Sequence, residues 1–288
     1  MAASPQTGTR TMLLRPHTLI AALFAAALVF PSAAVRAQTA KPEMRESCPG
    51  LVASHPPRPT AASLRLAALA ADQVRVSYAG HSTFLIESPQ SVRIATDYND
   101  YVHVPLLPTI ATMNRAHDTH FSEYPNPAIP HVLGGWAPAG APARHDLQVQ
   151  DVRVRNVPTN IRDYSGGTER HGNSIFIFEV GSLCIAHLGH LHHTLNQQQL
   201  DEIGRIDVVL VPVDGSFTLD IEGMIEVLRA LKAPLMIPMH YFSLYTLQRF
   251  IDGTRGQSWE VEWASEPSIT LSRASLPSMP KILVLPGR

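Results

Sequence analysis

Residues 183–193 of the chain read LCIAHLGHLHH, an apolar run that leads into four histidines. A short apolar run bounded by turn residues is typical of a strand buried in a sheet. Residues 208–214, VVLVPVD, and residues 235–241, LMIPMHY, repeat the pattern, because each is an apolar run followed by an ionisable residue. Histidines that follow strands in distant segments can meet at one edge of a sheet, where open sheets bind their ligands.

Strand patterns surround this segment. Residues 74–78 alternate apolar and polar side chains, as a half-buried strand does, and residues 83–86 continue the pattern. A hairpin through residues 88–90 would join them to a short strand at 92–95. Further strand patterns lie at 147–157, 174–180 and 259–285.

Two helices interrupt the strands. Residues 194–203 begin with Thr194 and Gln197, which match a capping box, and Gly204 ends the pattern. Apolar residues recur at helical spacing over 220–232, which predicts an amphipathic helix. Mixed strands with helices outside them predict a layered α/β domain in one piece.

Residues 105–144 are rich in proline and glycine and predict a long loop. The loop carries His117, His120 and His131. A long irregular segment in a compact domain is usually functional. Because the chain has 14 histidines and histidine is the commonest metal ligand, these positions point to a metal site.

The composition limits the partners. The 288 residues suffice for one large core or two modest ones. Lys and Arg total 23 and Asp and Glu total 24, so the formal net charge is −1. A nearly neutral chain has no electrostatic reason to bind nucleic acid or an anionic membrane. We therefore expect a small-molecule partner and no nucleic acid.

Residues 1–37 have the order of a secretory signal peptide. Arg10 and Arg15 precede an apolar run at 19–30, and small residues up to Ala37 offer a cleavage site. The apolar run has 12 residues, whereas a stable membrane span needs about 20. We expect cleavage and a periplasmic or secreted protein; an uncleaved anchor is the alternative.

Residues 38–72 predict an extended lead-in, with a short helix at 61–71, and the globular domain is expected at 73–288. No second stretch is long and apolar enough to span a membrane. An oxidising compartment permits a disulfide between the two cysteines, Cys48 and Cys184. Cys184 lies in the apolar run, however, which favours a buried thiol.

Six segments together resemble the metallo-β-lactamase superfamily: YAGHSTFLIES at 78–88, TMNRAHDTHF at 112–121, HGNSIFIFEV at 171–180, CIAHLGHLHH at 184–193, IDVVLVPVDG at 206–215 and PMHYF at 238–242. They are most similar to its branch of ascorbate-6-phosphate-lactonase-like and N-acylphosphatidylethanolamine-phospholipase-D-like metal-dependent hydrolases. The resemblance implies an αββα sandwich with a metal site at one edge, between the two sheets.

Against the family's HxHxDH motif, this chain has Arg115, His117, Thr119 and His120. The first histidine of the motif is replaced by arginine and its aspartate by threonine. Of the family's three ligands for its first metal ion, only His117 is kept. The resemblance therefore implies a remodelled site rather than the full two-metal centre.

The remaining motif positions supply the expected ligands. The family's third-motif histidine corresponds to Arg162, its bridging aspartate to His190, and its last histidine to His240. Three imidazoles with one open position are a known catalytic zinc arrangement. We expect one ion, zinc or another divalent transition metal, on His120, His190 and His240, with His117 as a fourth ligand or a nearby base.

The two arginines at former ligand positions have two interpretations. A guanidinium group matches carboxylate or phosphate, so Arg115 and Arg162 could hold an anionic substrate group or stabilise a developing oxyanion. Alternatively they form ordinary salt bridges with Asp118 or Asp163, which contribute little.

Five further residues are assigned roles by their place in the pattern. His81 and Asp97 match family positions near the site, which implies that they support the metal ligands. His187, inside AHLGH, is expected to orient its neighbours. Asp214 stands where relatives often have glycine and is expected to reach toward the pocket. Tyr241 is expected to donate a hydrogen bond to the substrate.

The function that these features predict is an exported metal-dependent hydrolase. A metal-bound hydroxide would attack an ester, lactone, amide or phosphoester bond. The alternative is a binding protein on the same fold that has lost catalysis, because the carboxylate ligands are replaced. A β-lactamase in the strict sense fits the export signal but not the motif branch.

Overall fold

The smaller of two sheets comes mostly from the first half of the chain. The computed structural model describes residues 68–163 and 165–287. Within them, this sheet has six strands, in the order β13 (Ser268–Leu271), β1 (Val74–Gly80), β2 (Thr83–Glu87), β3 (Arg93–Ala95), β4 (Ile110–Met113) and β5 (His131–Gly134). β2 and β3 form the predicted antiparallel hairpin, and β3, β4 and β5 run parallel. β1 and β2, expected to be one continuous strand pattern, are separate strands that pair antiparallel through a turn at His81 and Ser82.

The larger sheet has eight strands within the same residues, in the order β12 (Glu260–Trp263), β14 (Lys281–Val284), β11 (Leu235–Met239), β10 (Val208–Pro212), β9 (Leu183–His187), β8 (Thr168–Val180), β7 (Val152–Arg162) and β6 (Asp146–Val149). β9, β10 and β11 pair in parallel. Their carboxyl ends therefore meet at one edge, which brings the segments that follow them together.

Apolar side chains of the two sheets form a shared core. Val76 and Phe84 of the smaller sheet belong to one buried cluster with Phe178, Leu210 and Ile237 of the larger sheet. Each such side chain stabilises the fold by roughly 1.5–3 kcal/mol relative to an exposed one. This cluster holds the sheets face to face and so sets the spacing of the loops at their edge.

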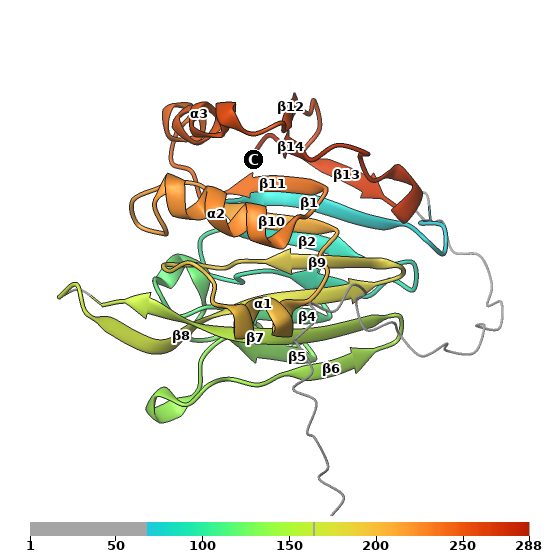
Figure 1. Ribbon diagram of the computed structural model, residues 1–288. Coiled ribbons are helices and arrows are strands. Elements are labelled where there is room, and N and C mark those ends of the chain that lie inside the picture. The colour runs from blue at the N-terminus through green and yellow to red at the C-terminus, as the bar shows by residue number, and fades with distance from the viewer. Residues whose placement is uncertain (1–67, 164, 288) are drawn as a thin grey trace, which may run out of the picture. The chain divides into compact units, whose positions relative to one another are not determined.

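The three α-helices of the described residues cover the other face of the larger sheet (Figure 1). They are α1 (Gln197–Ile203), α2 (Ile221–Leu231) and α3 (Leu244–Gly253). Ile203, Leu228 and Phe250, one from each helix, share a buried cluster with Val209 and Val211 of β10. β9, β10 and β11 are buried at every residue because side chains pack against both faces of the sheet, which explains their unbroken apolar sequences.

The helix predictions are partly confirmed. α2 starts after Asp220, whose side chain accepts the Gly223 N–H, and ends at the left-handed Lys232. α1 ends at Gly204 as expected, but its capping box uses Asn196 with Gln199 instead of the predicted pair two residues earlier. α3, which begins after a Ser243 cap, is not predicted from the sequence at all.

The prediction of a long loop at 105–144 is wrong in part. β4 and β5 lie within it, joined to the smaller sheet by parallel ladders. Each has only four residues, and β4 is buried along its whole length. Tertiary pairing thus produces strands where the proline- and glycine-rich local sequence favours a loop. The short 3₁₀ turn Asp118–His120 follows in the same segment.

Several N-terminal predictions lie outside the described residues: the signal peptide at 1–37, most of the lead-in at 38–72 and the environment of Cys48. Residues 68–71 of the expected helix at 61–71 are described and are not helical. Cys184 is buried in β9 but is disulfide-bonded, so the expectation of a free thiol is wrong. No helix among the described residues is long and apolar enough to cross a membrane.

A substitution at Gly189 tests how closely the loop after β9 approaches its neighbours. Gly189 has φ +60°, and an added Cβ would lie 2.4 Å from both Asn114 Nδ2 and Asn173 Oδ1. We expect Gly189→Ala to destabilise the fold by about 2–4 kcal/mol, because strain and steric overlap act together. Thermal unfolding measures this.

The matched control is Gly140→Ala. Gly140 has a similar φ of +69° but open space around the added Cβ. Gly140→Ala should lower the free energy of unfolding only by the backbone strain, on the order of 1 kcal/mol. Equal losses of stability in the two variants would contradict the steric explanation.

Candidate metal centre

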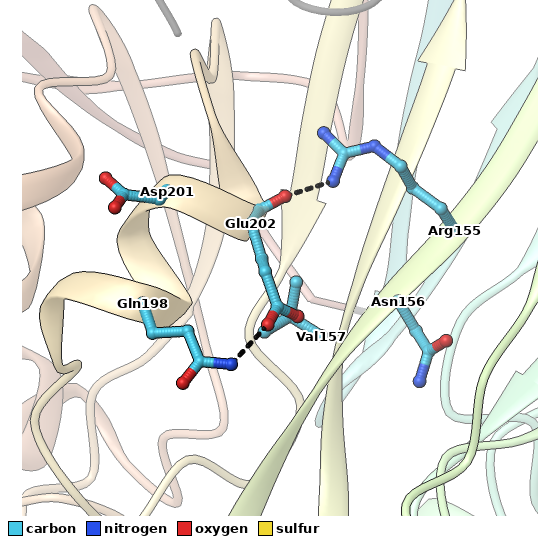
Figure 2. Close-up of a pocket in the computed structure, with 6 residues that line it drawn as sticks. All are labelled: Arg155, Asn156, Val157, Gln198, Asp201 and Glu202. Atoms are coloured by element: carbon cyan, nitrogen blue, oxygen red, sulfur yellow. Dashed lines mark hydrogen bonds between the residues drawn. The ribbon is translucent and has the colours of Figure 1, made fainter. Parts of the chain in front are cut away.

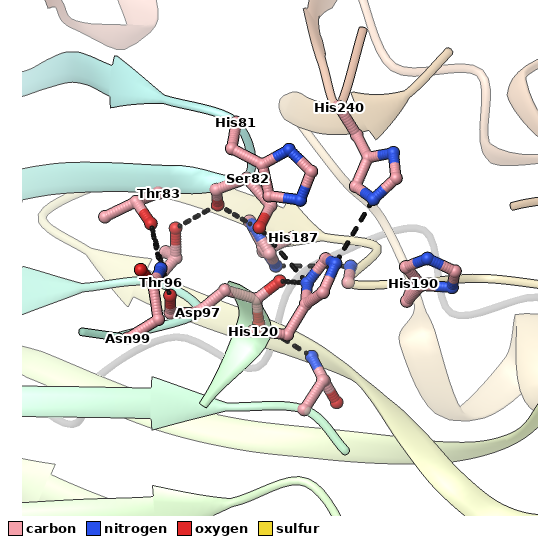
Figure 3. Close-up of polar contacts among 12 residues, drawn as sticks. His81, Ser82, Thr83, Thr96, Asp97, Asn99, His120, His187, His190 and His240 are labelled. Atoms are coloured by element: carbon pink, nitrogen blue, oxygen red, sulfur yellow. Dashed lines mark hydrogen bonds and ion pairs between the residues drawn. The ribbon is translucent and has the colours of Figure 1, made fainter. Parts of the chain in front are cut away.

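His120 lies at the end of the 3₁₀ turn and is fully buried. Its Nδ1 is 2.5 Å from Asp97 Oδ2 and 3.1 Å from Ser82 Oγ (Figure 3). Because an ionised carboxylate only accepts hydrogen bonds, Nδ1 carries the proton. The lone pair of His120 is therefore on Nε2, which faces the centre of the cluster.

His240 directly follows β11 and has the same arrangement. Its Nδ1 is 3.1 Å from Asp214 Oδ1, so Nδ1 donates and Nε2 keeps its lone pair. Its Nε2 lies 3.2 Å from His120 Nε2. Two carboxylate-backed imidazoles thus point their free nitrogens at each other. Carboxylate–histidine pairs of this kind are typical of the surroundings of metal ions.

His81, in the turn between β1 and β2, completes the cluster. Its ring centroid lies 4.2 Å from that of His240 and 5.1 Å from that of His120. Its Nε2 is buried without a hydrogen-bond partner. Nitrogens of His81, His120 and His240 all lie within 4.8 Å of one another. The sequence predicts a supporting role for His81, but the structure places it beside the expected ligands.

The cluster fits a divalent metal ion. Two imidazole nitrogens on one tetrahedral zinc, each about 2.0–2.1 Å from it, would be about 3.3 Å apart. The separation of the His120 and His240 Nε2 atoms, 3.2 Å, matches this value. Facing lone pairs repel at that distance unless a cation lies between them.

Three residues of the centre have left-handed backbone conformations. The φ angles are +49° at His81, +41° at Asp97 and +55° at His240. Such a conformation costs about 1–3 kcal/mol for a residue other than glycine and persists only where the surrounding structure holds it. Hydrogen bonds hold the strained peptides: His240 N–H donates to His81 O, while the Thr83 hydroxyl and Asn99 amide donate to Asp97 O.

His187, the last residue of β9, uses both ring nitrogens within the protein. Its Nε2 donates to the Ser82 carbonyl, and its Nδ1 accepts the Gly189 N–H. No lone pair is left for a metal ion. His187 instead fixes the peptide of Ser82, whose hydroxyl contacts His120.

Burial keeps the imidazoles of His81 and His120 neutral. Desolvation, with neighbouring His240 and His120, lowers the pKa of His81 to about 3, and desolvation also lowers the pKa of His120. Burial alone would raise the pKa of Asp97, but the imidazoles of His187 and His120 hold it below its ordinary value. Neutral imidazoles backed by an ionised carboxylate are suited to a cation.

His190 and His117 lie against one side of the cluster. The His190 ring is fully buried, and its centroid is 4.8 Å from the rings of His117, His120 and His240. The group of converging nitrogens nevertheless contains His81 in the place expected for His190. His117 is half-buried, and burial lowers its pKa.

Asp214, expected to reach toward the pocket, contacts a histidine of the cluster from behind and is not free to bind a substrate. Its carboxylate is fully buried and accepts hydrogen bonds from the N–H groups of Ser216, Phe217 and Thr218 in addition to the contact with His240. The carboxylate therefore orients the His240 ring.

Arg162 does not offer its guanidinium to an anion. Its NH2 group donates to the carbonyl oxygens of Ser216, Phe217 and Thr218, at 2.9, 3.0 and 2.7 Å. Asp214 holds the N–H groups of the same three residues. The two side chains together fix this loop, and Asp214 in turn contacts His240.

Arg115 is half-exposed and forms an ion pair with Glu169 at 3.3 Å. The alternative partners Asp118 and Asp163 are also wrong, since within the described residues neither is paired with Arg115 or Arg162. Of the two interpretations of these arginines, the structure favours structural contacts, although the partners differ from those expected.

Tyr241 turns away from the histidine cluster. Its hydroxyl donates to the Leu285 carbonyl at 3.4 Å, and its ring lies 6.3 Å from that of Tyr78. The expected hydrogen bond to a substrate at the cluster is not available to it. Tyr241 instead lines a neighbouring hollow of about 520 Å³ that also contacts His81.

A hollow of about 560 Å³ lies elsewhere, between β7 and α1 (Figure 2). Its polar walls are engaged: Arg155 donates to the carbonyls of Glu202 and Ile203, and Gln198 donates to the Glu202 carboxylate. Groups already satisfied in this way leave little to bind a ligand, so this hollow is not a candidate site.

A family model described as a Beta-lactamase superfamily domain matches residues 75–240. The chain belongs to the metallo-β-lactamase superfamily. Superfamily membership and the two-sheet sandwich are confirmed, while the lactonase-like and phospholipase-D-like branch stays a prediction.

The matched relatives agree. A protein from Thermoplasma volcanium, named UPF0173 metal-dependent hydrolase, is 30% identical over 33% of this chain and 42% of its own length. One from Nanoarchaeum equitans with the same description is 25% identical over 58% of this chain and 84% of its own length. The chain thus spans less than half of the first relative and most of the second.

A solved structure supports the same family. The crystal structure of a protein from Thermotoga maritima, described as a Zn-dependent hydrolase of the metallo-beta-lactamase superfamily, is 25% identical. The match covers 75% of this chain and all of that one, with a TM-score of 0.54.

Two residues of the centre are missed by sequence reasoning. Ser82 contacts His120, and the Asn114 amide donates to Asp97 Oδ1 at 3.0 Å while accepting the Ser174 N–H. Each lies within a segment that resembles the family, so its proximity to a ligand motif is the signal that could have identified it.

Substituting the carboxylates behind the ligands should weaken metal binding. We expect Asp97→Asn and Asp214→Asn each to reduce zinc affinity about 10–100-fold, because the amide no longer holds the imidazole in the ligating tautomer as strongly. Chelator competition measures the affinity. Asp146→Asn, which removes an exposed partner of Arg153, is the control and should leave it unchanged. Wild-type affinity in both buried variants would contradict the assignment.

Proposed function

We propose that the protein is a metal-dependent hydrolase of small molecules that binds one divalent transition-metal ion, with zinc the first candidate. The ion would be held by Nε2 of His120 and His240, with His81 as the third ligand. The observation that carries the proposal is the pair of facing Nε2 atoms, 3.2 Å apart, each on an imidazole backed by a buried carboxylate.

The relatives named metal-dependent hydrolases support this activity. When bound, such an ion supplies Lewis-acid activation of water and of a carbonyl or phosphoryl group. The chain's own residues fix the geometry: Asp97 and Asp214 hold the two imidazoles in one tautomer, and the strained peptides hold their positions. Esters, lactones, amides and phosphoesters are the bonds that this chemistry can hydrolyse.

The surroundings of the cluster favour a substrate with an apolar group. The 520 Å³ hollow next to His81 is lined by Tyr78, Tyr241, Leu244 and Trp263 among others. Its volume is in the range of small-molecule pockets, about 300–1,000 Å³. Because His81 belongs to both, a substrate cleaved at the cluster can place an apolar arm in the hollow.

Two exposed phenylalanines extend this apolar surface. Phe242 lies 5.4 Å from the His240 ring and 5.4 Å from Phe217, which in turn is 6.5 Å from His117. Phe217 and Phe242 are each 57% exposed, and their contact makes a small apolar patch on the surface. Their position beside the histidines suits them to contact a substrate.

We also propose that the protein is exported to the periplasm or secreted. The support is the order of charged, apolar and small residues in 1–37. The protein can be produced in a bacterial host that exports proteins to a periplasm. N-terminal sequencing of the exported protein should then find a chain that begins near Gln38. An intact Met1 in the mature fraction would overturn the proposal.

Metal content and hydrolysis should depend on the same histidines. We expect one equivalent of zinc in the wild type and a loss of at least 90%, roughly tenfold or more, in His120→Ala and His240→Ala, because each removes one of about three protein ligands. Elemental analysis measures the metal, and a panel of esters, lactones, phosphodiesters and a chromogenic β-lactam measures hydrolysis. The exposed His103→Ala is the control.

The outcomes separate the alternatives. Metal binding without hydrolysis of any panel member would favour a binding protein on the same fold, which the replacement of motif ligands by Arg115 and Thr119 would explain. Turnover of the β-lactam alone would favour a β-lactamase. Absence of bound metal after supplementation would overturn the hydrolase proposal.

The hollow should set substrate selectivity. We expect Trp263→Ala to raise KM for long-chain or aromatic esters about tenfold relative to acetyl esters, since a buried aromatic contact contributes on the order of 1–2 kcal/mol. Steady-state kinetics on an acyl-chain series measures this. Tyr124→Ala, at a ring that is 87% exposed, is the control. The same KM change across the whole series would contradict a role for the hollow in selectivity.

A further inference from the structure

A chain of hydrogen bonds connects the end of β7 to the histidine cluster. The Arg162 backbone N–H lies 2.5 Å from His192 Nδ1, and His192 Nε2 lies 2.5 Å from His190 Nδ1. His190 and His192 are both buried. The His190 ring then packs against His117, His120 and His240.

The Arg162 N–H fixes which atom donates in each of these hydrogen bonds. A backbone N–H can only donate, so His192 Nδ1 must be the unprotonated nitrogen of its ring. A neutral His192 then carries its proton on Nε2 and donates it to His190 Nδ1. A neutral His190 that accepts at Nδ1 carries its own proton on Nε2.

The tautomer of His190 is therefore opposite to that of the two expected ligands. In His120 and His240, a carboxylate accepts from Nδ1 and leaves the lone pair on Nε2. In His190, Nδ1 accepts and Nε2 bears the hydrogen. A metal ligand needs a lone pair, which an Nε2–H group lacks.

If His190 were to bind a metal ion through Nε2, every hydrogen bond between Arg162, His192 and His190 would have to reverse its direction. Its Nδ1 would carry the proton and face His192 Nε2, which would have to become the acceptor. His192 Nδ1 would then be protonated and would oppose the Arg162 N–H, two donors 2.5 Å apart. Nothing in that contact can accept a hydrogen bond.

The Nε2–H group of His190 has no use within the protein. Nε2 is buried and has no hydrogen-bond partner in the structure. A buried donor without a partner costs free energy, and at this place beside the histidine cluster a bound molecule is the partner it can find. Its ring packs against half-buried His117 and against the two imidazoles whose Nε2 atoms face each other.

We propose that His190 is a hydrogen-bond donor of the active centre and not a metal ligand: the Arg162 N–H and His192 fix its Nε2–H, which donates to the substrate oxygen on which negative charge develops. His192 is a positioning residue. The donor role rests on the proposed hydrolase function, whereas the tautomer and the absence of ligation do not. No proton is transferred in this role.

The tautomers can be measured directly in the full chain. Protein labelled with ¹⁵N-histidine, with zinc added, gives long-range ¹H–¹⁵N correlations that show which ring nitrogen bears the hydrogen. We expect Nε2–H for His190 and His192 and Nδ1–H for His120 and His240. His190→Gln and His192→Gln assign the signals. Protonation of His190 on Nδ1, with a metal-shifted Nε2, would overturn the proposal.

A pair of variants separates donation from ligation. His190→Gln keeps an N–H donor, whereas His190→Leu removes it. We expect both to retain one equivalent of zinc, unlike His120→Ala. We expect kcat to fall about 100–1,000-fold in the leucine variant, as for loss of an oxyanion donor, with KM little changed and partial recovery in the glutamine variant.

The controls keep the result decisive. His131→Gln, at a half-buried position on the edge strand β5, should change neither metal content nor kcat. Loss of zinc in His190→Gln equal to that in His120→Ala would overturn the proposal. If the leucine variant does not fold, the wild-type tautomers still decide. If the protein hydrolyses no panel member, only the donor role fails, and the tautomer and metal measurements still stand.

Discussion

Parallel pairing of β9, β10 and β11 is the constraint on which the rest of the centre depends. It brings three strand ends to one edge of the larger sheet, so that the loop after β9, Asp214 after β10 and His240 after β11 become neighbours. The smaller sheet then contributes His81, Asp97 and His120 across the shared apolar core. Without that core, the ligands on the two sheets would not face each other.

At this edge, each imidazole takes its chemical character from what its Nδ1 meets. Asp97 and Asp214 accept hydrogen bonds from Nδ1, so the lone pairs of His120 and His240 lie on Nε2 and face each other. Gly189 N–H donates to His187, whose Nε2 then binds the Ser82 carbonyl. In our proposals, histidine thus serves here as metal ligand, as structural support or as hydrogen-bond donor, according to the groups around each ring.

The strand pattern, α2 and the segments around His120 and His240 could be predicted, because local periodicity and motif order carry that information. The role of Arg162 could not, since its partners are three backbone carbonyls 54–56 positions away. The place of His81 among the ligand nitrogens depends on how the two sheets pack, which no local pattern encodes. β4 and β5 were hidden for the same reason, because their ladders are made with distant segments.

The left-handed backbone at His81, Asp97 and His240 has a consequence for how this protein could change over time. At each position, glycine would adopt the same backbone conformation without strain. Selection for a more stable fold therefore favours glycine, whereas selection for the present side chain favours the imidazole or the carboxylate. Descendants freed from the need to hold an ion would be expected to lose these three side chains early.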